Sequence, residues 1–395
     1  MNKAVVLGCN YYIGLSMIRC LGREGVHVVA CDYDFETYGA KSKYICEFLK
    51  VHDLNENDEQ TFLDLIEYGK KQDEKPVILP SHDKYVEFID KYYDELEKYY
   101  LISQVRGLNT KLMDKWVLYD IAKENGVKIP TTINANDEKL VEKVKNEVGF
   151  PCIIKPVDTV KFTKVFRNKV FICNNVEEME NGIKKAKDND IEIFIQEIVP
   201  GFDDCMLTYD CYIDKNGKTT HYMTAQKQRQ WPINFGASCF TIQKYNQKLI
   251  DISKPFLEKI GYRGFGEIEF KKHEKTGEIY LIEINARTTN FNNLIYKIGI
   301  NTPYIEYLDL TGNLKESDCK YIDYDTNYAF IYGFEDMVAI WRYKKTKQVG
   351  ILKSLKISFS SKWAPAIFAI YDLKPWFFFN KILLGKVFRK IFRRK

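Results

Sequence analysis

The chain has 395 residues, 45% of them hydrophobic and 29% charged, which is typical of a folded protein and not of a disordered one. That length predicts two or three domains. The ten cysteines contain no Cys-x-x-Cys pair, and none of the five histidines lies three or four residues from another, so neither a zinc site nor a disulfide framework is expected. Reduced cysteines in a cytoplasmic enzyme fit better, and the N-terminus turns polar by Asn10, too early for a signal peptide.

The net charge of +5 is concentrated in one part of the chain. Residues 341–395 contain fifteen Lys or Arg and one acid, Asp372, a net charge of +14 that leaves −9 for residues 1–340. Nucleic-acid-binding proteins usually carry basic side chains across their binding face. The acidic body therefore predicts no nucleic-acid partner, and the basic C-terminal region needs a separate explanation.

The N-terminal part is expected to form a parallel α/β domain. An apolar strand at 4–8 runs into a loop from Gly8 to Gly14 and a helix, and the next strand follows at 26–32, the order of a right-handed crossover unit. The loop lacks the middle glycine of Gly-x-Gly-x-x-Gly, which disfavours a nicotinamide dinucleotide. A further apolar strand at 76–80 ends at Ser81-His82-Asp83, so this turn and the glycine loop are expected to line the acceptor side of a cleft.

The middle of the chain alternates short strands with helices. A helix is predicted at 109–128, closed by Asn125-Gly126. Strands are predicted at 148–156, 169–173, 193–199, 207–213 and 219–224, with a helix near 176–188 and a hairpin at 265–287. We expect three parts: an α/β domain at 1–105, a larger domain at 106–335 with a small subdomain at about 130–200, and a basic C-terminal region at 336–395.

The C-terminal region ends in a basic amphipathic segment, predicted as a helix at about 376–395. The apolar half of its helical wheel holds Leu383, Leu384, Val387, Phe388, Ile391 and Phe392, and the basic half holds Lys386, Arg389, Lys390 and Arg393. The apolar run from Trp363 is interrupted by Asp372, Lys374 and Pro375, so it is too short to span a bilayer. Such a helix is typical of an anchor on an anionic membrane surface, with docking on its own domain, RNA binding and dimerisation as alternatives.

The hairpin carries an unusual set of polar side chains. A turn symmetric about Thr276 places Glu269 opposite Glu283, with Glu267 on the face of Glu269 and Asn285 on that of Glu283. The other face is expected to hold Ile268, Phe270, Tyr280, Ile282 and Ile284. Facing carboxylates repel, but a divalent cation removes the repulsion, and Mg²⁺ is typically held by one or two carboxylates and substrate phosphates. The alternative is an edge hairpin with a solvated, charged face.

Two further motifs precede the hairpin. Ile153-Ile154-Lys155-Pro156 is a strand that ends in a lysine, which indicates an anionic partner, and residues 194–201 form a strand leaving through a Pro-Gly turn. In this order, and with Glu269, Glu283, Asn285 and Arg287, the motifs resemble the ATP-grasp superfamily, in particular carboxylate–amine ligases related to D-aspartate ligase of bacterial cell-wall synthesis. The resemblance covers about residues 1–310. It implies an α/β and α+β fold, in which a parallel pre-ATP-grasp domain precedes a two-subdomain ATP-grasp fold and the basic amphipathic tail.

The resemblance also implies a role for each matching position. Lys111 and Lys155 would contact the phosphates of ATP, and Asp204 or its neighbour Asp203 would reach its ribose. The adenine would lie along the strand formed by Gln196, Glu197, Ile198 and Val199. Two Mg²⁺ ions, which Mn²⁺ can replace, would be bound by Glu269, Glu283 and Asn285. Arg287 would stabilise the charge that develops during phosphoryl transfer.

Two more segments contribute candidate residues. No glycine-rich phosphate loop follows Lys155, and the family's backbone cradle could be replaced by point charges from Lys161, Lys164, Arg167 and Lys169, unless these form only a solvated hairpin tip. Residues 226–232 resemble a Lys-x-Arg-Gln stretch of the D-aspartate-ligase-like branch. This implies that Arg229 binds a substrate carboxylate with Lys227 as helper, the alternative being a surface loop with incidental charge.

The expected function is that of an ATP-dependent ligase. It would activate a small amino acid as an acyl phosphate and join it to an amine on a peptidoglycan or surface-polysaccharide precursor. It would act in the cytoplasm, at the inner face of the cell membrane, and a homodimer is left open. The alternatives are a catalytically silent ATP-binding adaptor at the membrane, an ATP-dependent enzyme with a thioester or other non-amide product, and an NAD-dependent oxidoreductase.

Overall fold

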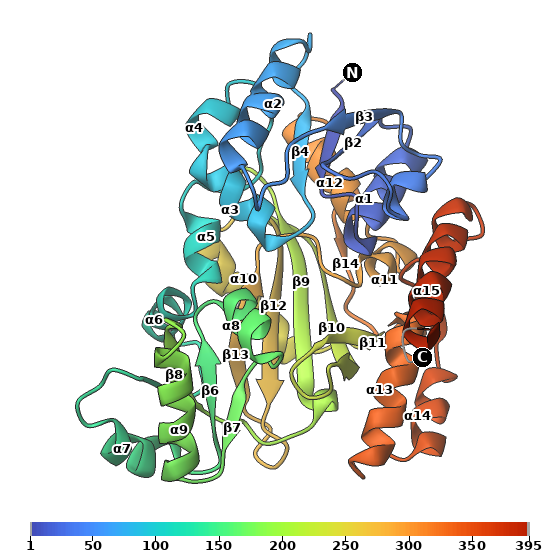
Figure 1. Cartoon of the computed structure of the whole chain (residues 1–395). Coiled ribbons are helices and arrows are strands. Elements are labelled where there is room, and N and C mark those ends of the chain that lie inside the picture. Colours follow the sequence, from blue (N-terminus) through green and yellow to red (C-terminus); the bar gives the residue numbers. More distant parts are fainter. Residues whose placement is uncertain (1, 393–395) are drawn as a thin grey trace.

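The N-terminal domain is built around a parallel sheet. The computed structural model describes residues 2–392 and orders the strands of this sheet β3-β2-β1-β4 (Figure 1). Its elements are β1 (Ala4–Leu7), α1 (Tyr12–Arg23), β2 (Val28–Asp32), the 3₁₀ turn η1 (Gly39–Lys41), β3 (Glu47–Lys50), α2 (Asp58–Lys70), β4 (Val77–Pro80), α3 (Asp83–Lys91) and α4 (Tyr93–Leu96). Alternate residues of β1 pack into two different hydrophobic clusters, because both faces of the sheet are covered. The predicted parallel α/β unit is confirmed.

A small antiparallel sheet, ordered β5-β8-β6-β7, follows the N-terminal domain. The elements of this region are α5 (Leu108–Met113), α6 (Lys115–Glu124), β5 (Thr132–Asn134), α7 (Leu140–Lys143), the π-helical turn η2 (Val144–Val148), β6 (Cys152–Pro156), α8 (Thr159–Phe166), β7 (Phe171–Cys173), α9 (Val176–Lys187) and β8 (Ile193–Glu197). Two expectations were wrong here. The helix predicted at 109–128 breaks at Asp114, whose carboxylate caps α6, and the basic segment after Lys155 forms helix α8, capped by Asp158.

An eight-stranded sheet forms the centre of the molecule, in the order β13-β12-β9-β10-β11-β15-β16, with β14 beside β10 (Figure 1). Its strands are β9 (Met206–Ile213), β10 (Thr219–Trp231), β11 (Ala237–Gln243), β12 (Gly264–Lys272), β13 (Ile279–Asn285), β14 (Lys320–Tyr321), β15 (Tyr328–Ile331) and β16 (Lys362–Pro365). The connecting helices are η3 (Asp203–Cys205), α10 (Gln247–Lys259), α11 (Asn292–Lys297), α12 (Thr302–Leu310), η4 (Glu316–Asp318), α13 (Gly333–Lys345) and α14 (Ile351–Ser358). This mixture of one parallel and two largely antiparallel sheets is the fold class that the sequence predicts.

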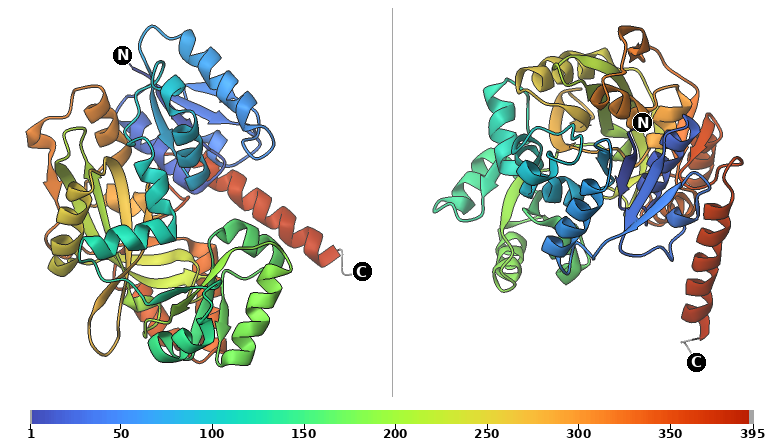
Figure 2. Two further views of the ribbon diagram at one scale, coloured as in Figure 1. Left: turned by 90° about the vertical axis from the view of Figure 1, so that its left-hand side faces the viewer. Right: turned by 90° about the horizontal axis from the view of Figure 1, so that it is seen from above.

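The C-terminal region belongs to the body of the molecule as far as about residue 380. Strand β16 pairs in parallel with β15. The last helix, α15 (Lys374–Phe392), begins with Trp376, Phe378 and Phe379 packed against the core of the N-terminal domain and then projects outward (Figure 2). Most of the basic C-terminal region expected at 336–395 thus packs into the folded body, a contact that the sequence did not reveal. The basic side chains predicted at 386–393 lie outside the described side chains.

A buried ion pair fastens the C-terminal region to the N-terminal domain. Arg19 of α1 donates from Nε to Asp372 Oδ2 at 2.9 Å, and its other nitrogens donate to the carbonyl oxygens of Ile367 and Asp372, each at 2.8 Å. Ser42 also donates to Asp372 Oδ2. Both charged side chains are at most 2% exposed, so each compensates a charge that would otherwise be buried alone.

We expect the substitution Asp372→Asn to destabilise the fold by about 3–5 kcal/mol, because it leaves the Arg19 guanidinium buried without a counter-charge. Urea denaturation followed by circular dichroism measures the loss. The matched control is Glu67→Gln, which breaks an exposed pair with Lys71 and should change stability by no more than about 0.5 kcal/mol. Equal stabilities of the two variants would contradict the proposed role of the Arg19–Asp372 pair.

Candidate active site

The hairpin of β12 and β13 has the predicted register at its polar end. Glu269 lies opposite Glu283 and Glu267 lies opposite Asn285. A bulge follows Glu269, so that Phe270 faces Leu281. Leu281 therefore joins Ile268, Phe270 and Ile284 in the core, whereas Ile282 lines a cavity. The expectation that Tyr280 and Ile282 fill the apolar face was wrong, because the bulge reverses the alternation of β13.

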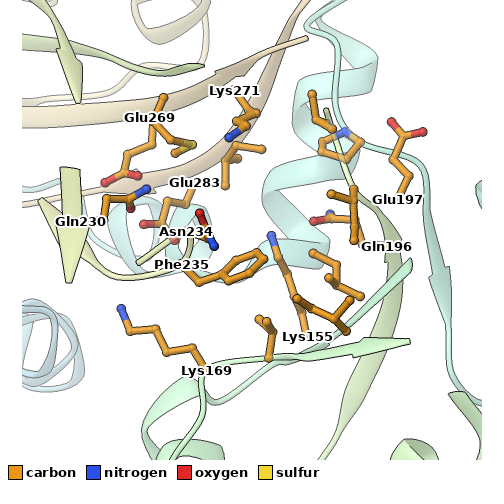
Figure 3. A pocket seen from close by; sticks show the side chains of 18 of the residues that line it. Lys155, Lys169, Gln196, Glu197, Gln230, Asn234, Phe235, Glu269, Lys271 and Glu283 are labelled. Atoms are coloured by element: carbon orange, nitrogen blue, oxygen red, sulfur yellow. The ribbon is translucent and has the colours of Figure 1, made fainter. Parts of the chain in front are cut away.

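A cavity of about 350 Å³ lies between the small sheet and the central sheet (Figure 3). Its volume is in the range of small-molecule sites. The wall from the small sheet includes Lys155 of β6 and the residues from Gln196 to Val199 in and after β8. Glu269 and Glu283 form part of the opposite wall. The structure thus brings together a lysine, a hinge strand and two carboxylates that lie far apart in the sequence.

Three further lysines line the cavity wall; Lys169 was expected as a point charge for phosphate, whereas Lys115 and Lys271 were not expected. Lys115 begins α6 directly after the cap Asp114, and this capping residue was the sequence signal available for it. Lys271 lies two residues beyond Glu269 on the same strand, as the period of a strand allows. Asn234, Phe235 and Gly236, in the turn between β10 and β11, also line the cavity, and no sequence signal pointed to them.

Three residues expected at the nucleotide do not line the cavity. Lys111 is exposed on α5, one turn before Lys115. Lys164 is exposed on α8, and Lys169, past the end of that helix, reaches the cavity instead. Asp204 is exposed outside the cavity, while its neighbour Asp203 is buried and accepts a hydrogen bond from Gln230. Lys115 and Lys169 thus reach the wall in place of Lys111 and Lys164, whereas neither Asp203 nor Asp204 lines it.

The carboxylates of β12 and β13 lie in a strongly charged environment. Lys227 of β10 is buried and lies 2.5 Å from Glu269. Burial favours its neutral form, but Glu269 and Glu267 outweigh this and raise the pKa of Lys227. Burial likewise opposes the charge of Glu283, yet Lys115 and the other nearby lysines hold the pKa of Glu283 below its usual value. Charged lysines and a charged Glu283 therefore stabilise each other.

Two further acidic side chains, Glu267 and Asp210, are buried behind the cavity wall. Burial and the Glu269 carboxylate raise the pKa of Glu267 to about 7. Asp210 lies opposite Glu267 on β9, and burial together with Glu267 raises its pKa strongly. Glu267 Oε1 and Asp210 Oδ1 are buried without a hydrogen-bond partner among the described residues. Burial thus favours the protonated forms of Glu267 and Asp210, and a cation brought close to them would favour their charged forms.

The donor set fits a magnesium ion shared with a phosphorylated ligand. In the described part of the chain, no three His, Cys, Asp or Glu side chains are placed to hold a metal ion by themselves. Mg²⁺ typically takes one or two protein carboxylates and completes its shell with phosphate oxygens and water. Glu269 and Glu283 face each other at the cavity wall and supply two carboxylates. Asn285 lies farther along, where its amide donates to Glu267 Oε2 at 3.1 Å.

Arg287 links the central sheet to the N-terminal domain. Its Nε lies 2.7 Å from Asp83 Oδ1, at the start of α3, and one of its terminal nitrogens donates to Asn285 Oδ1 at 3.3 Å. The carboxylate of Asp83 remains about half exposed. Arg287 is therefore close to the carboxylate face, but Asp83 holds it outside the wall of the cavity.

Arg229, expected to bind a substrate carboxylate, is occupied elsewhere. Its guanidinium pairs with both carboxylate oxygens of Asp336 at 2.6 and 2.9 Å and with Ser358 Oγ at 2.7 Å. It is 3% exposed and does not line the cavity. The structure assigns it to the contact between β10, α13 and α14. The carboxylate-binding expectation for Arg229 is therefore not met, because α13 supplies a carboxylate of the chain itself.

The N-terminal loop from Gly8 to Gly14 packs against neighbouring parts of its own domain. Asp32, the acid that a dinucleotide ribose would require, accepts hydrogen bonds from the backbone amides of Asn10, Tyr33 and Asp34. Gly8 has φ +81°, and a Cβ there would meet Ser81 and Tyr85. The loop is thus packed against the end of β4, and its acidic residue is used for internal hydrogen bonds, which disfavours a dinucleotide site.

Comparisons with known proteins agree with this geometry. Residues 114–298 match the family described as carbamoyl-phosphate synthase L chain, ATP binding domain. The chain is 26% identical over 238 residues to a D-aspartate ligase of Enterococcus faecium and 25% identical over 190 residues to a D-alanine–D-alanine ligase of Fusobacterium nucleatum. These matches cover 58% and 44% of this chain, and each spans 56% of the relative, so little more than half the length of the curated relatives is matched.

Solved structures show the same fold. An N5-carboxyaminoimidazole synthetase of Staphylococcus aureus complexed with ADP has a TM-score of 0.62 at 16% identity, covering 80% of this chain and 78% of the other. A biotin carboxylase–β-γ-ATP complex of Campylobacter jejuni has a TM-score of 0.65 at 13% identity, covering 83% and 74%. These structures share the fold of this chain, which confirms the predicted ATP-grasp fold. The family match at residues 114–298 and the similarity to D-aspartate ligase agree with the predicted resemblance.

The lowered pKa of Lys155 leads us to predict that anion binding in the cavity depends on pH. Burial and the nearby charge of Lys115 lower this pKa to about 8. A lysine with a lowered pKa is charged below that value and neutral above it, so its attraction for a phosphate is lost as the pH rises. We expect the affinity for ADP to fall by up to about tenfold per pH unit above pH 8. Titration calorimetry between pH 7.5 and 9.5 measures this fall.

The matched control is Lys155→Arg, whose side chain stays charged over this range. Its affinity for ADP should change little between the two pH values. An equally steep fall in the wild type and in Lys155→Arg would show that another group titrates, and would contradict the placement of phosphate beside Lys155.

Proposed function

We propose that this ATP-grasp protein is an ATP-dependent ligase that forms a carbon–nitrogen bond between a carboxylate and an amine. The observation that carries the proposal is the meeting of Lys155, the hinge after β8 and the facing pair Glu269 and Glu283 in one cavity. The similarity to D-aspartate ligase and D-alanine–D-alanine ligase supports the reaction class. The proposal extends to the whole chain an activity that these relatives match over only part of their length.

Each wall of the cavity would serve a different part of ATP. The backbone that follows Glu197 would offer donors and acceptors to a planar base, while Ile153, Ile172 and Met206 give the cavity apolar surfaces. The amines of Lys115, Lys155 and Lys169 would hold the phosphates by charge, since this chain has no glycine-rich cradle. Glu269 and Glu283 would bind Mg²⁺, which neutralises phosphate charge during transfer. The number of ions and the use of Mn²⁺ remain part of the proposal.

The chemistry needs no nucleophile from the protein. A substrate carboxylate oxygen attacks the γ-phosphorus of ATP, the bond to the bridging oxygen breaks, and ADP leaves. The amine nitrogen then attacks the acyl carbon, inorganic phosphate leaves, and the nitrogen loses a proton. The protein would supply orientation and charge. Arg287, held by Asp83 beside the carboxylate face, would meet an anion that enters between the N-terminal domain and the central sheet.

We propose a chemical class for each of the two substrates. The carboxylate is a small amino acid, and the amine belongs to a peptidoglycan or surface-polysaccharide precursor, as the similarity to cell-wall ligases suggests. We also propose that the protein acts at the inner face of the cell membrane. The basic charge of residues 341–395 supports the location.

Two rival functions predict different behaviour. A silent ATP-binding adaptor binds Mg·ATP but releases no ADP with any carboxylate and amine. An enzyme with a thioester product releases ADP without an amine. Neither the closed glycine loop nor Asp32 favours the third rival, an NAD-dependent oxidoreductase.

We expect ADP release only when a D- or L-amino acid and an amine acceptor are present together with Mg²⁺. A coupled assay that screens both classes of substrate, with envelope precursors as acceptors, measures it. Glu283→Gln should lower the rate by about 100-fold or more, because it removes a charge that neutralises the metal while preserving shape. The matched control Glu278→Gln, at the exposed turn of the same hairpin, should leave the rate unchanged. Full activity of Glu283→Gln would contradict the site.

A further inference from the structure

Helix α13 exposes an apolar stripe on one side. Phe334, Met337 and Trp341 recur at helical spacing and are 44, 64 and 55% exposed. The opposite side of the helix is buried through Asp336 and Tyr343. Large exposed apolar side chains are normal when scattered, but a continuous stripe indicates a surface that is covered in use.

Helix α14 has its amphipathic character reversed. Leu352, 84% exposed, lies on the outer side with Leu355 and Phe359, whereas the buried side carries Ser354 and Ser358. A helix on a protein surface normally buries its apolar side. Here Arg229 fixes the inverted orientation, because it donates to the Ser354 carbonyl and to Ser358 Oγ while paired with Asp336. The protein thus uses a buried ion pair to turn apolar side chains outward.

The exposed apolar surface continues beyond α14. Phe359 packs on Trp363, with ring centroids 5.5 Å apart, and Trp363 is itself 42% exposed. Farther along the chain, Ile370 in the loop before α15 is 80% exposed and Phe377 of α15 is 61% exposed. Helices α13, α14 and α15 lie along the same side of the molecule in the views of Figures 1 and 2. We call the exposed apolar side chains between residues 334 and 377 the apolar face.

The apolar face is surrounded by positive charge. Every Lys and Arg between residues 341 and 381 is exposed, including Lys353 and Lys356 on α14 itself. The one acid in this range, Asp372, is buried against Arg19 and offers no charge to the surface. A second copy of the chain would bring the same positive charge against it, which costs Coulomb energy. A surface of opposite charge would be attracted.

We infer that the apolar face docks on an anionic lipid bilayer. Exposed Trp, Phe and Leu side chains beside Lys and Arg are what interfacial membrane contacts use, with apolar groups entering the boundary and cations meeting lipid phosphates. Within residues 2–392, no helix is long and apolar enough to cross a bilayer. The contact therefore lies on the membrane surface. Because the apolar face belongs to the folded body, its contact with the bilayer would set the orientation of the body relative to the membrane.

Vesicle binding by the full-length chain tests this inference without any turnover, so its failure is separate from a failure of the proposed ligase activity. The probes are sucrose-loaded vesicles of equal parts phosphatidylglycerol and phosphatidylcholine, and vesicles of phosphatidylcholine alone. The test variant is Leu352→Gln with Phe359→Gln, which keeps the charge constant. The matched control is Leu63→Gln with Phe48→Gln, two side chains that are 48 and 52% exposed on the N-terminal domain.

We expect the wild type and the control to bind the anionic vesicles, and the test variant to bind them at least about tenfold more weakly. Binding of the wild type should fall with added salt and be weaker on phosphatidylcholine alone. Unchanged binding of the test variant, or equal wild-type binding to both vesicles, would overturn the inference. A wild-type dimer in sedimentation velocity that the test variant alone converts to a monomer, with vesicle binding unaltered, would show instead that the apolar face joins two copies.

Discussion

The burial of carboxylates on neighbouring strands is the constraint on which the rest of this site depends. Glu267 and Glu269 of β12 lie between Asp210 of β9 and Glu283 of β13. Lys227 of β10 forms an ion pair with Glu269 and so compensates one of these negative charges. A protein interior does not tolerate uncompensated charge, so further cations are required. The lysines across the cavity supply positive charge to this site, and a bound Mg²⁺ would supply more. Both require a site between the two sheets.

The sequence predicted this site well where short-range geometry determines it. The facing of Glu269 and Glu283 followed from a symmetric turn, and Lys155 and the hinge followed from the ends of two strands. Prediction failed where a local irregularity intervened. A bulge after Glu269 moved Ile282 to the cavity, and a cap at Asp114 put Lys115 where Lys111 was expected. Such features depend on hydrogen bonds that residue types permit but do not specify.

Long-range pairing was the other source of error. The C-terminal region looked like a separate basic tail, yet its lone acid Asp372 reaches Arg19 across the whole sequence. Asp336 likewise forms an ion pair with Arg229, whereas the resemblance implied that Arg229 binds a substrate carboxylate. An acid isolated among bases was a usable signal of burial, but its partner could not be named without the fold. The Arg229–Asp336 pair also holds α14 so that its apolar side chains face outward.

Amide hydrogen exchange with and without Mg·ADP tests the central claim most directly, because it reports where the nucleotide lies. We predict slower exchange at residues 197–201 after β8 and around Lys155, with the loop from Gly8 to Gly14 unchanged, because the cavity is lined by the former and not by the latter. Protection at the glycine loop without protection of the hinge would contradict a nucleotide site between the small sheet and the central sheet.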